Sequence, residues 1–366
     1  MLSVIASFPG SHDPYFNPIL FRANTRNRSR LSSAASMRLQ FFPLIDAILS
    51  TGKKAIIHNI HSEQFDIKKI FSSEKIFVFK LAPAMDRSLV FRNALQLISK
   101  AKRSSVRLDL FYADNYVEIN GDMSELYREL AKLSSSILSH SELLYKELKS
   151  INPTLGFFKI SDPSLLCRQP FDFDLNSERC RILWFGQGEN IKYLLNSLEG
   201  LFAQCSSARY FELKILTRKD SLEKVVLPYL DMLKKKTIRV KPSSSWKILL
   251  EPWEDINQPC QLERLLGEAD ISFLPSDPSD PWKVGASTNR IIDSIQSGCI
   301  TVASQLPSYK QLKSISLLGS QYPQLVDYAW ENRISLSAKY SLLRDDLLQQ
   351  FSRKQVQRKW EDFVVN

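Results

Sequence analysis

Charged and polar residues gather at the start of a short helix expected within residues 269–305, ADISFLPSDPSDPWKVGASTNRIIDSIQSGCITVASQ. Lys283 and Arg290 bring positive charge to this point. The first backbone amides of a helix have no partner within the helix, and the helix dipole favours an anion beside them. The combination predicts a site for an anion such as a diphosphate.

One carboxylate, Asp293, lies a turn further along the same helix. It follows Asn289 by four residues and Arg290 by three, so the three side chains share a face. A carboxylate next to a phosphate site can accept hydrogen bonds from ribose hydroxyls. The residues alone leave an alternative open, in which Asp293 and Arg290 form a surface ion pair on an ordinary helix.

The elements that position these side chains form a strand–loop–helix–strand unit. Apolar strands are expected at Ile271–Leu274 and Cys299–Ala303, on either side of a helix from about Thr288 to Ser297. Ser287 or Thr288 is expected to cap this helix and Gly298 to end it. In such a unit the loop opens at the carboxyl end of the first strand, where ligands bind.

Strands and helices alternate along the rest of the chain, which predicts an α/β protein with two Rossmann-like domains. Domain limits follow from a Pro- and Asp-rich segment, SDPSLLCRQPFDFDLNSER, at 161–179. We expect an N-terminal domain at 1–160, a linker at 161–180, a second domain at 181–320 and helices at 321–366. The last of these helices is expected to cross back to the first domain.

Composition is that of a soluble globular protein: of 366 residues, 44% are hydrophobic and 24% charged. No apolar run approaches the roughly 20 residues that span a bilayer, and the first residues are expected to form a strand rather than a signal peptide. The five cysteines are scattered without a C-x-x-C pair. We therefore expect a cytoplasmic protein without disulfides or a structural metal.

The formal net charge of +10 is concentrated in the first 150 residues, where 21 Lys and Arg face 14 Asp and Glu, a net +7. Nucleic acid is not expected as a partner, because no recognised nucleic-acid-binding motif accompanies the charge. The excess positive charge has two interpretations. It indicates either peripheral attachment to an anionic membrane surface or a basic face exposed to solvent. The excess is strongest at Arg22, Arg26, Arg28, Arg30 and Arg38.

Two residues of the first half are candidates for acid–base chemistry. Asp114 follows the strand expected at Val106–Tyr112, and His58 lies at the strand expected at Lys54–Ile60. A carboxylate or an imidazole can take a proton from a sugar hydroxyl. The alternative for His58 is a purely structural histidine.

The stretch Asp293-Ser-Ile-Gln-Ser-Gly298-Cys-Ile-Thr-Val-Ala-Ser304 resembles the donor-sugar motif of the GT-B glycosyltransferases, in particular a divergent branch of the retaining family 4 (group 1) enzymes. The resemblance implies two parallel sheets facing across a cleft. It also implies that Asp293 holds the nucleotide ribose and that the helix start at Ser287, Thr288 and Asn289 holds the diphosphate.

Three further donor-binding positions follow from the same resemblance. Gly186 ends the first strand of the second domain, and Lys192 stands six residues later, where the family has a phosphate-contacting lysine. Gly10 ends the first strand of the chain and allows a ligand close to the backbone. The chain departs from the family at Gly285, where the first of two acidic residues is usual, and at Gln187, where arginine is usual.

The resemblance therefore predicts a hexosyltransferase-like enzyme (EC 2.4) that moves a sugar from a nucleotide-sugar to a hydroxyl of a glycan, polysaccharide or lipid-linked acceptor. Retention, no metal and no cofactor beyond the donor substrate are part of this expectation. Two other classes stay open: a noncatalytic nucleotide- or glycan-binding GT-B-like protein, which the Gly285 departure favours, and a basic polyanion-binding α/β protein.

Overall fold

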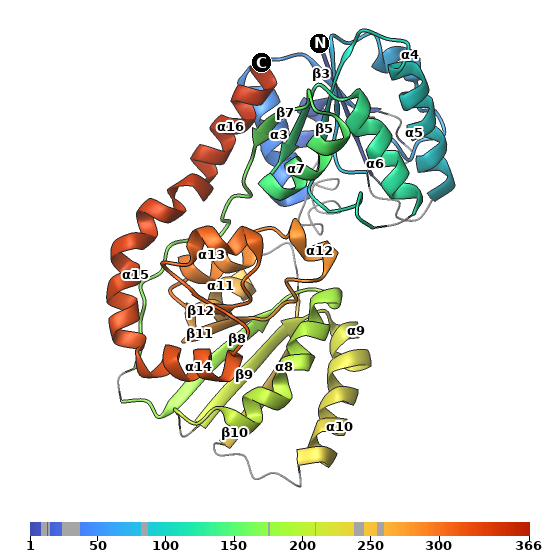
Figure 1. The fold of residues 1–366 in the computed structure, drawn as a ribbon. Coiled ribbons are helices and arrows are strands. Elements are labelled where there is room, and N and C mark those ends of the chain that lie inside the picture. Colours follow the sequence, from blue (N-terminus) through green and yellow to red (C-terminus); the bar gives the residue numbers. More distant parts are fainter. Residues whose placement is uncertain are drawn as a thin grey trace. The chain divides into compact units, whose positions relative to one another are not determined.

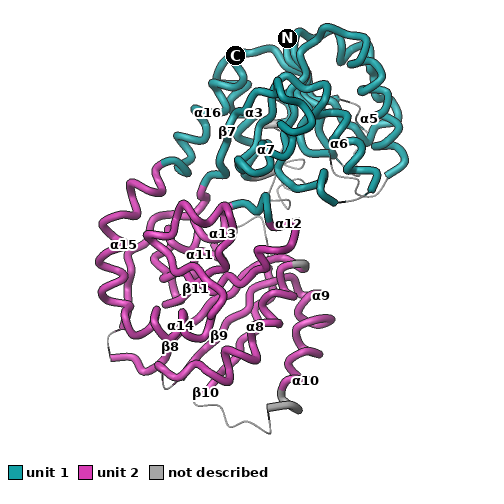
Figure 2. Tube along the Cα trace, in the orientation of Figure 1, with its two compact units in different colours: residues 1–163, 284–287, 350–366 teal, residues 164–283, 288–349 magenta. Residues whose placement is uncertain are grey.

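The computed structural model describes residues 1–8, 13, 15–23, 37–81, 87–119, 121–174, 176–208, 210–237, 245–254 and 260–366. These residues form two compact units, coloured separately in Figure 2. Unit 1 comprises Met1–Pro163, Val284–Ser287 and Gln350–Asn366, and unit 2 comprises Ser164–Lys283 and Thr288–Gln349. Each unit is built around its own sheet.

The sheet of unit 1 has seven strands in the order β2-β3-β1-β4-β5-β6-β7. All pairings are parallel except that of the edge strand β2 with β3. Because β1 lies between β3 and β4, the strand order reverses at its carboxyl end. The strands are β1 (Leu2–Ala6), β2 (Tyr15–Phe16), β3 (Ala55–Asn59), β4 (Lys75–Val78), β5 (Arg107–Phe111), β6 (Ser136–Ser139) and β7 (Gly156–Lys159).

Helices cover both faces of this sheet, as alternation along β4 shows. Ile76 and Val78 pack in one core with apolar residues of α5, α6 and α7, whereas Phe77 packs in a second core with α3 and α16. The helices of unit 1 are α1 (Pro18–Ala23), a π-helix (Met37–Phe41), α3 (Phe42–Ser50), α4 (Ile67–Ile70), α5 (Arg87–Ala101), α6 (Asp122–Leu133), α7 (Glu142–Ile151) and α16 (Arg353–Val365).

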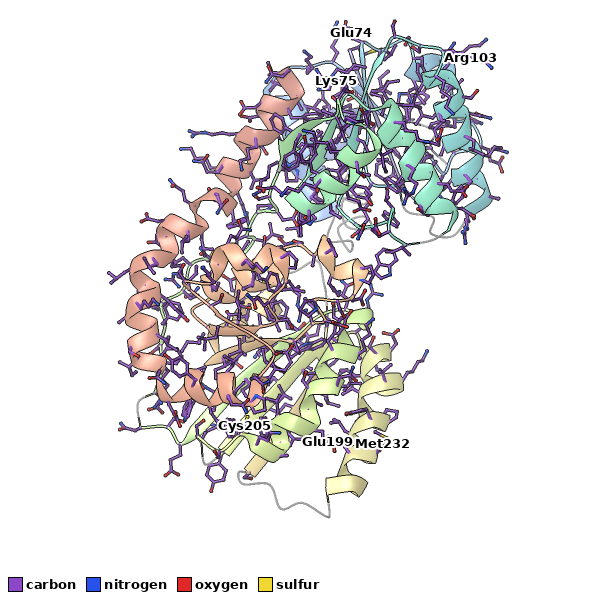
Figure 3. All side chains as sticks on the ribbon, in the orientation of Figure 1. Glu74, Lys75, Arg103, Glu199, Cys205 and Met232 are labelled. Carbon is purple, nitrogen blue, oxygen red and sulfur yellow. The ribbon has the colours of Figure 1, made fainter. Side chains whose placement is uncertain are left out.

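The final helix, α16, belongs to unit 1 because its apolar side chains fill the second core. Trp360 is fully buried and its ring lies 6.2 Å from that of Phe77. Lys75, labelled in Figure 3, donates to the carbonyl of Phe363 at 3.1 Å and stands 3.9 Å from the centre of its ring. A cation at the carboxyl end of a helix complements the helix dipole, so this contact stabilises the docked α16.

The sheet of unit 2 has six parallel strands in the order β10-β9-β8-β11-β12-β13. The first strand in the chain, β8, lies between β9 and β11, so the order reverses there. The strands, several of them labelled in Figure 1, are β8 (Arg179–Phe185), β9 (Tyr210–Thr217), β10 (Ser245–Pro252), β11 (Ile271–Leu274), β12 (Ile300–Ala303) and β13 (Leu317–Leu318).

The helical segments of unit 2 follow the strands in turn. They are a 3-10 turn (Gly188–Asn190), α8 (Ile191–Gln204), α9 (Lys219–Ser221), a π-helix (Leu222–Val226), α10 (Leu227–Thr237), α11 (Cys260–Gly267), α13 (Asn289–Gln296), a 3-10 helix (Pro307–Leu312), α14 (Tyr322–Glu331) and α15 (Arg333–Leu348). Two further segments, α12 (Pro281–Val284) and a 3-10 turn (Gln349–Phe351), have residues in both units. No helix in the described part of the chain is long and apolar enough to cross a membrane.

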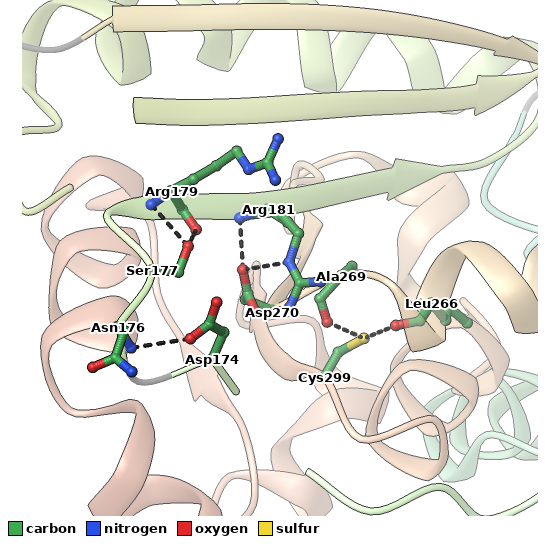
Figure 4. A network of polar contacts seen from close by, with 9 residues as sticks. All are labelled: Asp174, Asn176, Ser177, Arg179, Arg181, Leu266, Ala269, Asp270 and Cys299. Carbon is green, nitrogen blue, oxygen red and sulfur yellow. Dashed lines mark hydrogen bonds and ion pairs between the residues drawn. The ribbon is translucent and has the colours of Figure 1, made fainter. Parts of the chain in front are cut away.

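An ion pair joins the two central strands of unit 2 at their amino ends (Figure 4). The buried carboxylate of Asp270, just before β11, accepts from the Arg181 guanidinium at 2.7 and 3.1 Å and from the Arg181 backbone amide at 2.8 Å. Paired hydrogen bonds of this kind are strong and directional. They fix β8 beside β11 and therefore fix the point at which the strand order reverses.

The predicted α/β class with two mostly parallel sheets is confirmed. One local expectation differs from the structure. Strand β8 begins at Arg179, inside the segment predicted as a linker, because Cys180 already packs in the core.

Gly298 ends α13, as the sequence predicts, and the structure shows why no other residue suits the position. Its φ is +81°, in the left-handed region that side chains with a Cβ disfavour. A Cβ built there would lie 2.1 Å from the backbone oxygen of Pro170. The end of α13 therefore lies directly against the backbone at Pro170, in the first segment of unit 2.

We expect Gly298→Ala to lower the free energy of unfolding by about 2–4 kcal/mol. The strain of a positive φ and the steric overlap of the new Cβ with the Pro170 backbone both contribute to this loss. Denaturant unfolding measures the change. Gly267→Ala is the matched control, since a Cβ there meets nothing within 4 Å, and it should change stability by less than about 1 kcal/mol. Equal effects of the two substitutions would contradict the structure of this turn.

Candidate functional site

Arg290 of α13 lies at the carboxyl ends of the central strands of unit 2. Its guanidinium carbon stands 5.5 Å from the ring centre of Trp184 and 5.4 Å from that of Phe185, the last residues of β8. α13 itself packs on β11 and β12. Arg290 therefore occupies the point where the strand order reverses, the usual position of a ligand in an open α/β sheet.

The Arg290 guanidinium is enclosed without an acidic partner among the residues that the structure describes. Its Nε and Nη2 atoms are buried and make no hydrogen bond to those residues. Burial lowers the pKa of Arg290, and only the nearby Tyr309 hydroxyl opposes the shift. An enclosed, unpaired charge is unfavourable, so this cation is suited to receiving an anion.

Gly186 leaves room for this arrangement. A Cβ at Gly186 would lie 3.2 Å from the Trp184 ring and 3.5 Å from the guanidinium carbon of Arg290. A larger side chain would therefore displace one of the two groups. The predicted importance of Gly186 has a physical basis here, which is the close packing of Arg290 against the end of β8.

The start of α13 presents backbone amides beside Arg290. Thr288 is the N-cap residue, and its side chain makes no capping hydrogen bond. Asn289 is the first helical residue. The start of a helix favours an anion, and α13 begins at the point where the sequence predicts a helix to begin.

Asp293 lies one turn further along α13 and is partly buried. Its Oδ1 accepts a hydrogen bond from the Ser164 hydroxyl at 3.1 Å. The carboxylate therefore lies on the same helix as Arg290 and acts there as a hydrogen-bond acceptor.

Lys192 lies near the start of α8 and is engaged by a carboxylate from the loop after β11. Its Nζ stands 3.0 Å from Asp280 Oδ2, and the Tyr193 hydroxyl donates to the same oxygen. Burial and the Asp280 bond raise the pKa of Tyr193 to about 12. Lys192, which the resemblance predicts to contact phosphate, is therefore already paired with the Asp280 carboxylate.

Lys283 reaches the same group of residues from α12. Its Nζ donates to Asn190 Oδ1 at 2.7 Å and lies 5.2 Å from the centre of the Tyr193 ring. Lys192 lies 4.8 Å from that ring. The two predicted donor-binding lysines thus meet around Tyr193, near the amino end of α8.

Ser287 belongs to unit 1 and does not cap α13. Its hydroxyl donates to Asp162 Oδ2 at 2.5 Å, while Gln40 donates to the other oxygen of that carboxylate at 2.6 Å. The predicted N-cap alternative at Ser287 is therefore wrong, because the hydroxyl is taken up by Asp162.

Gly285 stands where the resembling family has an acidic residue, and in unit 1 its place is tightly enclosed. A Cβ there would lie 2.4 Å from Cδ1 of Leu144. His140 Nε2 donates to the Gly285 carbonyl at 2.6 Å. A carboxylate side chain at position 285 would require Leu144 to move. The structure therefore has no space there for the acidic residue of the resembling family.

In unit 1, Asp114 lies just beyond β5 and pairs with Lys80 at 2.5 Å. Burial disfavours the Lys80 ammonium, but Asp114, Tyr116 and Asp162 outweigh it and raise the pKa of Lys80. Asp114 is about one-third exposed. It is thus a partly accessible carboxylate at the carboxyl edge of the sheet of unit 1.

His58 is enclosed within β3, with its ring nitrogen 3.1 Å from the Ser3 hydroxyl. Burial, with the nearby Lys69, lowers the pKa of His58 to about 4 against the opposing effect of Asp66. The ring does not reach the surface, so its placement does not support the catalytic role predicted from sequence.

Gly10, one of the predicted donor-binding residues, lies outside the described residues.

Asp280, Tyr193 and Asn190 were not singled out as donor-site residues from the sequence. Asp280 lies 88 residues from Lys192, and no local spacing connects the two. The one feature of the sequence that could have pointed to Tyr193 is its position directly after Lys192. No group of three or more His, Cys, Asp or Glu able to hold a metal occurs among the described residues.

Solved structures with this architecture are known, although no protein-family model and no curated protein matches the sequence. Anabaena Alr3699/HepE in complex with UDP-glucose matches with a TM-score of 0.57 and 10% identity, over 100% of this chain and 99% of that one. The chain has the GT-B fold.

Two trehalose-phosphate enzymes share the GT-B architecture. The UDP-forming α,α-trehalose-phosphate synthase of Burkholderia xenovorans matches with a TM-score of 0.55 and 9% identity, over 100% of this chain and 97% of that one. The E. coli trehalose-6-phosphate protein bound with UDP-2-fluoro glucose has a TM-score of 0.55 and 10% identity, with 100% and 98% coverage. At this identity the likeness establishes the fold.

His58 gives a prediction of stability against pH. Its pKa in the folded protein lies below the ordinary value, so the neutral ring is favoured by folding. The neutral ring contributes about 3 kcal/mol to the free energy of unfolding above about pH 6.5. This contribution is lost as the pH falls towards 4.

We expect urea unfolding of His58→Gln to depend less steeply on pH between 6.5 and 4 than that of the wild type. His140→Gln keeps His58 in place and is the control, with the steep dependence retained. An unchanged slope in His58→Gln would show that His58 is not the enclosed neutral ring described here.

Proposed function

We propose that this protein is a glycosyltransferase that moves a sugar from a nucleotide-sugar to a hydroxyl group of an acceptor. The observation that carries the proposal is the enclosed Arg290 guanidinium without an acidic partner among the described residues. It lies where the strand order of unit 2 reverses, next to the uncapped start of α13. Such a site suits the diphosphate of a nucleotide-sugar.

The proposed donor contacts follow from the positions of the side chains. Arg290 and the amides at Thr288 and Asn289 bind the diphosphate, with Gly186 leaving the space. Asp293, which now accepts from Ser164, accepts instead from the ribose hydroxyls. Lys192 and Lys283 extend the positive charge towards the start of α8.

The chemistry of transfer accounts for these groups. The bond between the anomeric carbon and the diphosphate oxygen breaks, and negative charge develops on the leaving diphosphate. A fixed guanidinium, two lysines and helix amides stabilise that charge more strongly as it develops. The acceptor hydroxyl forms the new bond and gives up its proton, for which Asp114 is the candidate base.

Further details of the reaction belong to the same proposal. The motif that contains Asp293 and Gly298 resembles retaining enzymes, so we propose transfer with retention and without a metal. The acceptor is a glycan, polysaccharide or lipid-linked hydroxyl, and the enzyme acts in the cytoplasm. UDP-glucose and UDP-2-fluoro glucose, bound in two of the similar structures, make uridine nucleotides the first probes.

A noncatalytic nucleotide-binding protein is the second candidate, favoured by Gly285. The enclosed position beside Leu144 has no space for the acidic side chain of the resembling family. Turnover separates the candidates, because the enzyme releases free nucleotide from its donor in the presence of acceptor. A binding protein holds the donor without releasing it.

We expect UDP, or one other nucleotide among GDP, ADP and CMP, to raise the melting temperature of the wild type but not of Asp293→Ala. A ligand at about 100 times its Kd adds roughly 2.7 kcal/mol to stability. Asp327→Ala, which alters a carboxylate bonded to Ser206 and Ser207 elsewhere in unit 2, is the control and should respond like the wild type. No response to any nucleotide would favour the polyanion-binding class instead.

Membrane attachment, the second part of the proposal, is supported by an apolar patch on unit 1. Tyr15, Ile19 and Leu20 are 50, 64 and 69% exposed. Tyr15, Leu20 and Lys69 line a cavity of about 440 Å³. In the sequence, residues 14–45 contain five arginines and no acidic residue. Exposed apolar side chains beside Lys69, in a part of the sequence rich in arginine, suit an anionic bilayer surface.

We expect the wild type to sediment with vesicles that contain about 30% phosphatidylglycerol and not with pure phosphatidylcholine. Leu20→Asp should reduce sedimentation at least severalfold, because the charge opposes insertion. Leu342→Asp on α15, where the side chain is 81% exposed, is the matched control and should bind like the wild type. Equal binding by both variants would exclude this patch as the membrane contact.

A further inference from the structure

The loop between β11 and α13 places a carboxylate among the groups proposed to bind the donor. Asp280 Oδ2 accepts from Lys192 Nζ at 3.0 Å and from the Tyr193 hydroxyl, and Oδ1 accepts from the Trp282 backbone amide at 3.0 Å. The Asp280 side chain is 13% exposed, so it is well covered. An anion of the protein itself is therefore bound near the start of α8.

The chemistry of this contact is that of a phosphate site. An ammonium and a phenol hydroxyl converge on one oxygen of an anion, and Lys283 Nζ stands 5.2 Å from the centre of the Tyr193 ring. Burial opposes the charge on Asp280, but its bonds from Tyr193 and Lys192 outweigh this and lower its pKa. The carboxylate is thus held in its charged form.

We propose that Asp280 is an internal anion that competes with the donor phosphates for Lys192 and Tyr193, and so sets the affinity for the nucleotide-sugar. The inference rests on the proposed function, because it takes the ligand at Lys192 to be a nucleotide phosphate. A donor gains these two groups only when Asp280 leaves them. The nucleotide affinity of the wild type is therefore lower than its positive groups would allow.

The loop is built so that Asp280 can leave without unfolding its surroundings. Residues 277–283 form turns closed on themselves: Asp277 Oδ1 accepts from the amide and hydroxyl of Ser279, and the Lys283 amide donates to the Asp280 carbonyl at 2.8 Å. Asp280 and the bond from Lys283 to Asn190 tie the loop to the start of α8. When Asp280 turns away, it loses its bonds to Lys192 and Tyr193 and the bond from the Trp282 amide, while the turn at Asp277–Ser279 stays closed.

Asp280→Asn tests the proposal, because the amide keeps the size of the side chain and removes its charge. We expect the Kd for UDP, measured by calorimetry, to fall about three- to tenfold, the scale of one exposed ion pair and one hydrogen bond. Asp277→Asn makes the same charge change in the same loop but contacts Ser279 rather than Lys192. It should leave the Kd within about twofold of the wild type.

Hydrogen exchange followed by mass spectrometry provides a readout of the displacement itself. In the wild type, the Trp282 amide donates to Asp280, so UDP should increase exchange in peptides that cover 277–283. In Asp280→Asn, exchange should be high before UDP is added. A loop that becomes better protected when UDP binds would overturn the displacement.

The outcomes separate this inference from the proposed function. If UDP binds to the wild type with Asp293-dependent affinity but Asp280→Asn binds equally or more weakly, the proposed donor site stands and the competing role of Asp280 is wrong. In that case Asp280 positions Lys192 instead of occupying it. If neither protein binds any nucleotide, both are wrong; binding by Asp280→Asn alone would support both.

Discussion

The constraint on which the site depends is an arginine enclosed between the end of a strand and the start of a helix, with no carboxylate to neutralise it among the residues that the structure describes. Most buried charges in proteins are paired, because an unpaired one is unfavourable by several kcal/mol. Arg290 stands against Trp184 and Phe185, and Gly186 provides the space. Such an arrangement has a cost in free energy, and the proposed diphosphate would remove that cost by pairing with the guanidinium.

The frame around Arg290 could be predicted from the sequence to a large extent. Alternating apolar strands and amphipathic helices identify both sheets, and Gly298 marks the end of α13 in advance. Helical spacing correctly places Arg290 and Asp293 on one short helix. These features depend on local sequence patterns, which extend over ten to twenty residues.

What could not be predicted depends on contacts between residues far apart in the chain. Asp280 and Lys192 meet across 88 residues, and Ser287 is drawn to Asp162 across 125. Sequence pattern also could not decide that His58 faces Ser3 inside the sheet, because alternation along a strand fixes two faces without saying which one is open. The cations of the proposed donor site could therefore be picked out from the sequence, whereas Asp280, which lies beside one of them, could not.

The most direct measurement compares the binding of UDP and uridine by calorimetry in the wild type and in Arg290→Met. The two ligands differ only in the diphosphate, so the ratio of their Kd values isolates the contribution of the anion site. We expect UDP to bind the wild type at least about 100-fold more tightly than uridine, the scale of two or so charge-assisted hydrogen bonds, and this ratio to fall towards one in Arg290→Met. An undiminished ratio in Arg290→Met would show that the diphosphate binds elsewhere and would contradict the central claim.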